Sequence, residues 1–223
     1  MTNVITIDGP SGVGKGTISE HLSDQLKWNY LNSGALYRAI AWVARNDLIN
    51  LNDTKGLEKA SKNIIFSLEN KKLKIQYKNK DIGSLIYDEE VAKIASKVSS
   101  KPKVRESIIT IQRSFKKAPG LVAEGRDMGS VIFPESQLKI FLTASIETRA
   151  QRRFKQLKDR EFNVSLPALI KDLDARDRRD KERVNSPLVI PKGALVIETD
   201  NLTVIEVKNT VNEKVNKTYG TNI

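Results

Sequence analysis

A glycine-rich loop close to the first residue constrains the fold of this chain more than any other stretch. The loop consists of Gly9, Pro10, Ser11, Gly12, Val13, Gly14, Lys15, Gly16 and Thr17. The apolar run Val4-Ile5-Thr6-Ile7 precedes it, and a helical pattern of Ile18, Leu22 and Leu26 follows it. A strand, a G-x-x-x-x-G-K loop and a helix, in that order, are the context of a phosphate-binding loop. The sequence therefore predicts a nucleoside triphosphate site at residues 9–17.

In such a loop the backbone N–H groups and the start of the following helix bind phosphate oxygens. Lys15 then reaches the β- and γ-phosphates. A glycine-rich turn that only joins a strand to a helix is the alternative interpretation. Gly16 follows Lys15 where Ser or Thr is usual, and the hydroxyl comes one residue later, at Thr17. This G-K-G-T form resembles the loop of nucleoside monophosphate kinases.

The length of 223 residues and the 39% hydrophobic content suffice for one domain, or for a domain with an insert. The chain has no cysteine, which excludes disulfides, zinc–thiolate sites and thiol catalysis and fits a cytoplasmic protein. No run of about 18 apolar residues is present, so no membrane span is predicted. The first strand begins within a few residues, which leaves no room for a signal peptide.

The net charge of +11, from 38 basic and 27 acidic residues, implies an anionic partner. Nucleic acid is one candidate, and small phosphorylated substrates combined with a lysine-rich solvated surface are the other. The aromatic content is only 6%, and no basic stripe interleaves with aromatic residues. No known nucleic-acid module is visible. We therefore expect no nucleic-acid partner, although a nucleic-acid-dependent ATPase remains the alternative from a different class.

The rest of the chain alternates strands with helices, which predicts an α/β fold of the P-loop NTPase type, with a parallel sheet flanked by helices. The core strands are expected at about 3–7, 28–31, 121–123, 138–143 and 194–198. A small antiparallel insert with strands at 64–68, 73–77 and 82–86 interrupts this alternation. Helices are expected at 15–27, after Ser33, at 54–63, 88–100, from 102, at 146–158, after Ser165 and after Thr203.

Several details of these elements are further predictions. Ser33 is expected to cap the helix that follows it. Thr203 and Glu206 match a capping box, and the last helix is expected to bury Val204, Val211 and Val215. Residues 159–164 are predicted to form a short mobile loop, and residues 218–223 a frayed terminus. The single histidine, His21, is interpreted as a helix-surface residue rather than a general base.

Polar residues gather where strands are expected to end, and ligands bind there in open α/β sheets. After residues 28–31 come Ser33, Gly34 and Arg38, which could face one phosphate, although a plain cap beside a surface arginine is equally compatible. After residues 121–123 comes the Arg126-Asp127 pair, a site candidate or a surface ion pair in a turn. Arg176, Asp180 and Arg183 share one helical face. That face points to a site or belongs to an exposed, salt-bridged helix.

Four motifs combine in a characteristic order: G-P-S-G-x-G-K-G-T, N-S-G-A-L-Y-R, E-G-R-D-M-G-S-V-I-F-P and R-D-R-R-D-x-x-R-x-x-S-P-L. With these motifs the chain resembles bacterial cytidylate kinases over about residues 4–207. The resemblance implies an ATP-dependent phosphotransferase that converts CMP or dCMP to CDP or dCDP. Kinases for UMP, AMP or shikimate, and a catalytically idle P-loop scaffold, are the alternatives within the fold.

The resemblance also implies roles for individual residues. Residues 9–17 would hold the ATP phosphates. The CMP phosphate would be bound by Ser33, Arg38, Arg126 and Arg183. The cytosine would be read by Ser96, Arg105 and Asp127, and the sugar contacted by Arg176 and Asp180. Arg149 and Arg153 would close over the transferring phosphoryl, so the catalytic candidates are Lys15, Arg126, Arg153 and Arg183.

Magnesium is expected mainly on the nucleotide and water, with Thr17 as the one possible protein contact. Asn32 and Glu124 stand where the family commonly has Asp, so both positions depart from the family's usual pattern. The expected division is a core at 1–33, 101–150 and 184–223, a monophosphate-binding insert at 34–100, a lid at 151–164 and an Arg-rich helix at 165–183. The resemblance further implies a monomer with small nucleotides as its partners.

Overall fold

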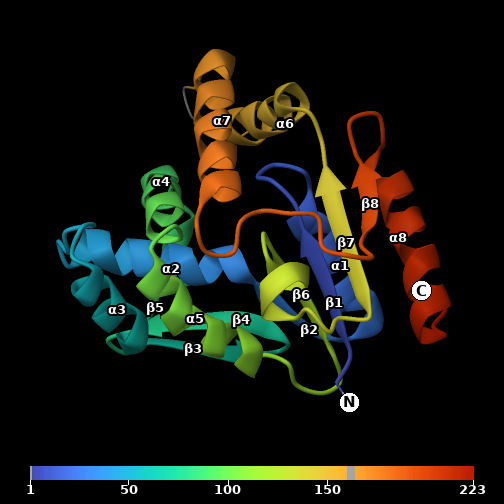
Figure 1. Ribbon diagram of the computed structural model, residues 1–223, viewed down its shortest axis with the longest axis horizontal. Helices are drawn as coiled ribbons and strands as arrows, with labels where there is room; N and C mark the ends of the chain where they lie inside the picture. The colour runs from blue at the N-terminus through green and yellow to red at the C-terminus, as the bar shows by residue number, and fades with distance from the viewer. Residues whose placement is uncertain (1, 160–163) are drawn as a thin grey trace.

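A computed structural model describes residues 2–159 and 164–223 as two sheets surrounded by helices (Figure 1). The larger sheet has five strands in the order β2-β6-β1-β7-β8, and all four pairings are parallel. Its strands are β1 (Val4–Asp8), β2 (Asn29–Asn32), β6 (Leu121–Gly125), β7 (Leu138–Thr143) and β8 (Leu195–Glu198). All residues of β1 and β6 are buried, as in a parallel sheet with both faces covered. The predicted α/β fold class is confirmed.

Two hydrophobic clusters flank this sheet, one on each face. On one face α1 (Lys15–Leu26) and α8 (Val204–Tyr219) pack against β1 and β7. On the other face lies the cluster that includes α2 (Ser33–Asn46), α3 (Thr54–Asn63), α4 (Glu89–Val98) and α5 (Pro102–Ser114). The apolar spacing of each helix places one stripe in its cluster. The predicted helices therefore form where they were expected.

Two predictions for the last helix are wrong. Val204 is 54% exposed, and Val207 takes its place in the core with Val211 and Val215. The terminus is not frayed, because the Tyr219 hydroxyl donates to the Val4 carbonyl at 3.1 Å and the Ile223 N–H donates to Asn216 Oδ1 at 3.0 Å. These tertiary contacts hold in place the terminal residues that the sequence alone predicts to be frayed. The capping box of Thr203 and Glu206 is confirmed.

The smaller sheet is antiparallel and consists of β3 (Ile64–Glu69), β4 (Lys72–Tyr77) and β5 (Lys80–Asp81). Asn70 and Lys71 form its tight turn with φ values of 49° and 66°. The predicted third strand at 82–86 is wrong, because β5 is shorter and lies earlier. The Asp81 carboxylate accepts from the Gly83 N–H and turns the chain into a short helical segment, η1 (Leu85–Tyr87).

Helices α6 (Ile146–Lys158) and α7 (Leu166–Glu182) stand together at the top of Figure 1, beyond the end of β7. They share a small apolar cluster of Ala150, Leu157, Leu169 and Leu173. The predicted mobile loop at 159–164 and the predicted lid at 151–164 both include residues 160–163, which lie outside the described residues. Across the described ranges, none of the helices has the length and apolar character needed to cross a bilayer.

Candidate active site

The glycine-rich loop leaves β1 and curves into α1, as the sequence predicts. Gly9 has φ of +147° and passes so close to β7 that an added Cβ would lie 2.1 Å from the Leu142 carbonyl oxygen. Gly14 precedes the first turn of α1 with φ of +94°, a region that side chains disfavour. Residues 11–17 line a cavity of about 840 Å³. The loop therefore has the backbone geometry and the open space that a triphosphate requires.

Lys15 is buried at the base of this cavity. Its ammonium donates to the Pro10 carbonyl oxygen at 2.7 Å, which folds the side chain back over the loop. Burial lowers the pKa of Lys15, Arg126 lowers it further, and Glu124 opposes the shift. A buried ammonium near a second cation gains from any anion placed beside it. The lysine is thus arranged to favour phosphate oxygens.

Asn32 and Glu124 are paired residues on the neighbouring strands β2 and β6, and both line the same cavity. The Tyr30 hydroxyl donates to Glu124 Oε1 at 2.5 Å, and burial raises the pKa of Glu124. Asn32 Oδ1 accepts from the Ala35 N–H, so Asn32 caps α2. The prediction that Ser33 is the cap is wrong, because Ser33 is already helical and its hydroxyl accepts from Gln112 Nε2 at 2.7 Å.

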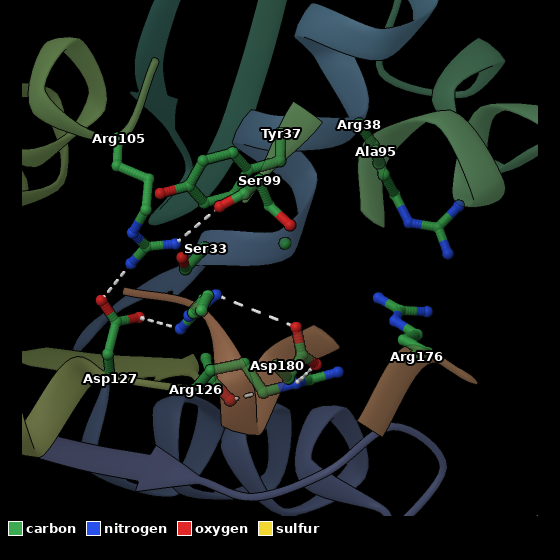
Figure 2. A pocket seen from close by; sticks show the side chains of 13 residues that line it. Ser33, Tyr37, Arg38, Ala95, Ser99, Arg105, Arg126, Asp127, Arg176 and Asp180 are labelled. Carbon is green, nitrogen blue, oxygen red and sulfur yellow. Dashed lines mark hydrogen bonds and ion pairs between the residues drawn. The ribbon is translucent and has the colours of Figure 1, made fainter. Parts of the chain in front are cut away.

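A second, smaller cavity lies beside the first and holds most of the predicted acceptor-site residues (Figure 2). Its lining includes Ser33, Arg38, Arg105, Arg126, Asp127, Arg176, Asp180 and Arg183. These residues come from α2, α5, the end of β6 and the end of α7, so only the tertiary fold brings them together. Ser96 lies elsewhere: it lines an adjoining cavity, where its hydroxyl accepts from Arg179 Nε at 3.2 Å. Instead, Ala95 of α4 and Ser99, which follows that helix, line the smaller cavity.

Two aspartates pair with three of the five arginines of this cavity. Asp127 forms a buried ion pair with Arg105 and lies 3.7 Å from Arg183 Nη2. Asp180 accepts from Arg126 Nε at 2.8 Å and lies 3.8 Å from Arg183 Nη1. Arg105 and Arg126 are thus fixed by charge-assisted hydrogen bonds to carboxylates, which are the stronger kind. Arg183 lies near both carboxylates, at ion-pair rather than hydrogen-bond distance.

The same cavity carries an excess of positive charge, because five arginines face two carboxylates. Burial and then Arg126 lower the pKa of Arg176 to about 10, which reflects the cost of crowding buried cations. The Nε atoms of Arg105 and Arg176 have no hydrogen-bond partner within the part of the chain that the structure describes. A multiply charged anion would relieve this excess, so the cavity suits a phosphate group.

One feature of the site was not predicted, namely the carboxylate that positions the Arg126-Asp127 segment. Asp8, the last residue of β1, accepts from the N–H groups of Met128 and Gly129 at 2.9 and 2.8 Å. These N–H groups begin the short helical segment η2 (Met128–Ile132). Burial raises the pKa of Asp8 to about 6 against these two hydrogen bonds. A carboxylate directly before Gly9 is the only signal that the sequence offered for this contact.

A third cavity of about 380 Å³ lies between α4, α6 and α7 and connects the two sites. It shares Ser11 and Gly12 with the first cavity, and Arg38 and Arg176 with the second. It is also lined by Lys93, Lys97, Arg153 and Arg179. Arg149 is buried nearby in the chain's core, where it donates to the Ser11 carbonyl oxygen at 3.2 Å and pairs with Asp177 at 2.7 Å. Positive side chains therefore line the path from the glycine loop to the smaller cavity.

Within residues 2–159 and 164–223, no three His, Cys, Asp or Glu side chains are grouped so that they could hold a metal ion. The glycine-loop cavity does have the exposed Thr17 and the buried Glu124 among its lining residues. A hydroxyl and one carboxylate near phosphate-binding N–H groups fit a magnesium ion that arrives with its nucleotide. They do not form a dedicated protein cage.

Comparisons with known proteins place the chain in a family. The family described as "Cytidylate kinase" matches residues 5–217. A cytidylate kinase from Aeromonas salmonicida is 42% identical over 95% of this chain and 93% of its own length. One from Coxiella burnetii is 46% identical over 93% of this chain and 90% of its own length. The crystal structure of TT1252 from Thermus thermophilus, at 17% identity, covers 99% of both chains with a TM-score of 0.51 and is similar in fold. This chain belongs to the cytidylate kinase family.

Proposed function

We propose that this protein transfers the γ-phosphoryl group of ATP to the phosphate of CMP or dCMP, which yields ADP and CDP or dCDP. The observation that supports the proposal is that two neighbouring cavities are connected by a third, which positively charged side chains line. Lys15 lies in the larger cavity, the Arg105–Asp127 pair lies in the smaller one, and Arg38 and Arg176 lie between them.

In this proposal, residues 9–17 bind the phosphates of ATP, and Lys15 follows the transferring group. Arg38, Arg126 and Arg183, together with the Ser33 hydroxyl, hold the acceptor phosphate so that its oxygen points at the γ-phosphorus. Phosphoryl transfer through a loose transition state depends on positioning and charge stabilisation. Guanidinium groups supply both, because their paired N–H donors match phosphate oxygens. No covalent nucleophile is required.

The Arg105–Asp127 pair would read the cytosine. A carboxylate accepts from the exocyclic amino group of cytosine, while a guanidinium donates to its ring acceptors. Uracil carries a carbonyl oxygen in place of that amino group and would face the Asp127 carboxylate without a hydrogen bond. Arg176 and Asp180 would contact the sugar. Ser99 lies in the smaller cavity, and Ser96 would have to reach it from the adjoining one.

Magnesium, when bound with ATP, would supply positive charge that offsets the charge developing on the phosphates. Thr17 would contact the ion, and Glu124 would hold its waters, with the Tyr30 hydroxyl fixing the carboxylate. Arg149 and Arg153 would reach the phosphates from α6. The insert at 34–100 would carry the acceptor, and the segment 151–164 would cover the donor. A monomer in the cytoplasm, with soluble nucleotides and no nucleic acid as partners, completes the proposal.

The test is a coupled assay of ADP release with MgATP against CMP, dCMP, UMP and AMP. We expect strong turnover with CMP and dCMP and little with UMP or AMP. Equal, weak release with all four acceptors would reject the proposed substrate. Strong release with UMP would instead support a uridylate kinase and reject the base-reading role of Asp127. ATP hydrolysis that RNA stimulates without CMP would favour the nucleic-acid-dependent ATPase.

A further inference from the structure

An ion pair between Glu89 and Arg153 links two helices that belong to different nucleotide sites. Glu89 lies in the first turn of α4, and Arg153 lies midway along α6. Both residues line the third cavity together with Ser11 and Gly12 of the glycine loop. Their side chains are 33% and 30% exposed. The pair therefore lies at the wall of the reaction cleft, where solvent and ligands can reach it.

Arg153 also lines the larger, glycine-loop cavity. Arg153 thus borders the cavity where a triphosphate would bind and is paired with the Glu89 carboxylate. A partly exposed pair of this kind changes an equilibrium by a factor of about two to five. The phosphates of ATP carry more charge and more acceptor oxygens than one carboxylate. They would compete with Glu89 for the guanidinium.

The helix that carries Glu89 is tied to the acceptor site. Ala95 and Ser99, at the other end of α4, line the smaller cavity. Just before α4, Asp88 pairs with Arg45 of α2 at 3.1 Å, and the Tyr87 ring lies 5.7 Å from the Arg38 guanidinium. A shift of α4 on acceptor binding would therefore move the carboxylate that Arg153 contacts.

We propose that Glu89 is a positioning residue that holds Arg153 against α4 until both nucleotides are bound. This inference rests on the proposed kinase function. With the acceptor absent, Glu89 restrains the guanidinium and places a negative charge near incoming phosphates. ATP then binds more weakly, and transfer of its γ-phosphoryl group to water is slower than it would be with a free Arg153. Acceptor binding on α4 releases the arginine, which then assists transfer of the γ-phosphoryl group to CMP.

The first experiment measures the affinity of a non-hydrolysable ATP analogue without CMP, by calorimetry, in Glu89→Gln and in Glu90→Gln. Glu90 is the matched control, because it is the next residue of α4 and pairs with Lys93 of the same helix at 3.3 Å. We expect about two- to fivefold tighter binding in Glu89→Gln only. CMP-independent ATP hydrolysis should rise by a similar factor, while kcat with both nucleotides saturating changes less than twofold. Equal affinities in the two variants would overturn the proposal.

A double variant distinguishes restraint of Arg153 by Glu89 from simple repulsion between Glu89 and the phosphates. In an Arg153→Gln background the gain from Glu89→Gln should disappear, because the restrained partner is gone. A gain that persists there would mean that Glu89 only repels phosphate and does not hold Arg153. Weaker analogue binding in Glu89→Gln would mean that the pair pre-organises the arginine, which also contradicts the proposal. Melting curves and a Glu89→Ala variant guard against a folding defect.

A failure of this positioning role can be distinguished from a failure of the proposed kinase function. Analogue binding needs no acceptor, so it tests the Glu89–Arg153 pair even if CMP proves not to be the substrate. A wild-type protein that releases no ADP with CMP would reject the kinase reaction alone. A wild-type protein that turns over CMP, with Glu89→Gln identical to Glu90→Gln, would reject the positioning role alone.

Discussion

At the scale of single residues, the proposed site presents fixed charges rather than a reactive nucleophile. Lys15 is folded over the glycine loop by its bond to the Pro10 carbonyl, and three arginines of the smaller cavity, Arg105, Arg126 and Arg183, are paired with Asp127 or Asp180. Preorganised cations of this kind stabilise the charge that develops during phosphoryl transfer. Single substitutions should therefore lower the rate without unfolding the protein.

Replacing Lys15 with Ala is expected to lower kcat by about 10² to 10³, because a preorganised contact to the transferring group is lost. Removal of a buried cation whose pKa is lowered by burial should not destabilise the fold, so the melting temperature should stay within a few degrees. Steady-state ADP release and a melting curve check both statements. Near-normal turnover in a folded variant would remove Lys15 from the reaction.

Replacing Asp127 with Asn is expected to lower kcat/KM for CMP more than tenfold, because the carboxylate no longer faces the cytosine amino group. The change also leaves Arg105 buried beside a neutral group, so some loss of stability is expected. The decisive measurement is selectivity. A specific role predicts that the ratio of CMP to UMP turnover falls, whereas a purely structural defect lowers both rates alike and leaves the ratio unchanged.

At the scale of elements, buried polar contacts hold the helices around the reaction cleft. Arg149 of α6 is paired with Asp177 of α7 and also donates to the Ser11 carbonyl oxygen. The glycine loop and the α6–α7 pair are thus connected through one side chain. Short elements depend on such contacts too, since the first two N–H groups of η2 donate hydrogen bonds to the Asp8 carboxylate.

The Arg149–Asp177 contact can be compared with an exposed pair on the same helix. Replacing Asp177 with Asn is expected to lower the free energy of unfolding by about 3 to 5 kcal/mol, because Arg149 stays buried without its counter-charge. Asp174, one turn earlier on α7, pairs with Arg178 with both side chains more than half exposed. Asp174→Asn should change stability by less than about 1 kcal/mol. Denaturant titration of both variants makes the comparison, and equal losses would contradict it.

At the scale of the whole molecule, Asp8 joins the centre of the sheet to the acceptor site, and it should make stability depend on pH. Its pKa is raised from 3.8 to about 6 in the folded protein. Between these two values the folded protein keeps a proton that the unfolded chain releases. The free energy of unfolding should therefore fall by about 3 kcal/mol as pH rises from about 4 to about 6. Below pH 4 and above pH 6 this contribution is constant.

Urea unfolding at several pH values checks this contribution against an Asp8→Asn variant. The variant cannot titrate at this position, so its unfolding free energy should fall less steeply between pH 4 and 6 than that of the wild type. Asp24→Asn, at an exposed position of α1, is the control and should keep the wild-type slope. Parallel curves for the wild type and Asp8→Asn would show that Asp8 ionises normally in the folded protein.

Much of the fold could be predicted from local patterns in the sequence. The apolar spacing of the helices, the buried strands and the glycine loop each depend on residues that are close in the chain. The positions of Ser33, Arg126 and Arg176, at the ends of strands and on one helical face, made them site candidates, and the family resemblance assigned them to one site. The structure brings those residues into one cavity.

What the sequence determined alone was therefore the order of elements, the α/β class and the family. Only the tertiary structure decided that Asn32 rather than Ser33 caps α2, that Ser96 lies in the adjoining cavity, and that the terminus is ordered. It also decided that Asp8 binds Gly129, 121 residues further along the chain. The physical reason is the separation of the interacting residues along the chain. Periodicity and capping depend on neighbouring residues, whereas burial, ion pairing and the resulting pKa shifts depend on groups that only folding brings together.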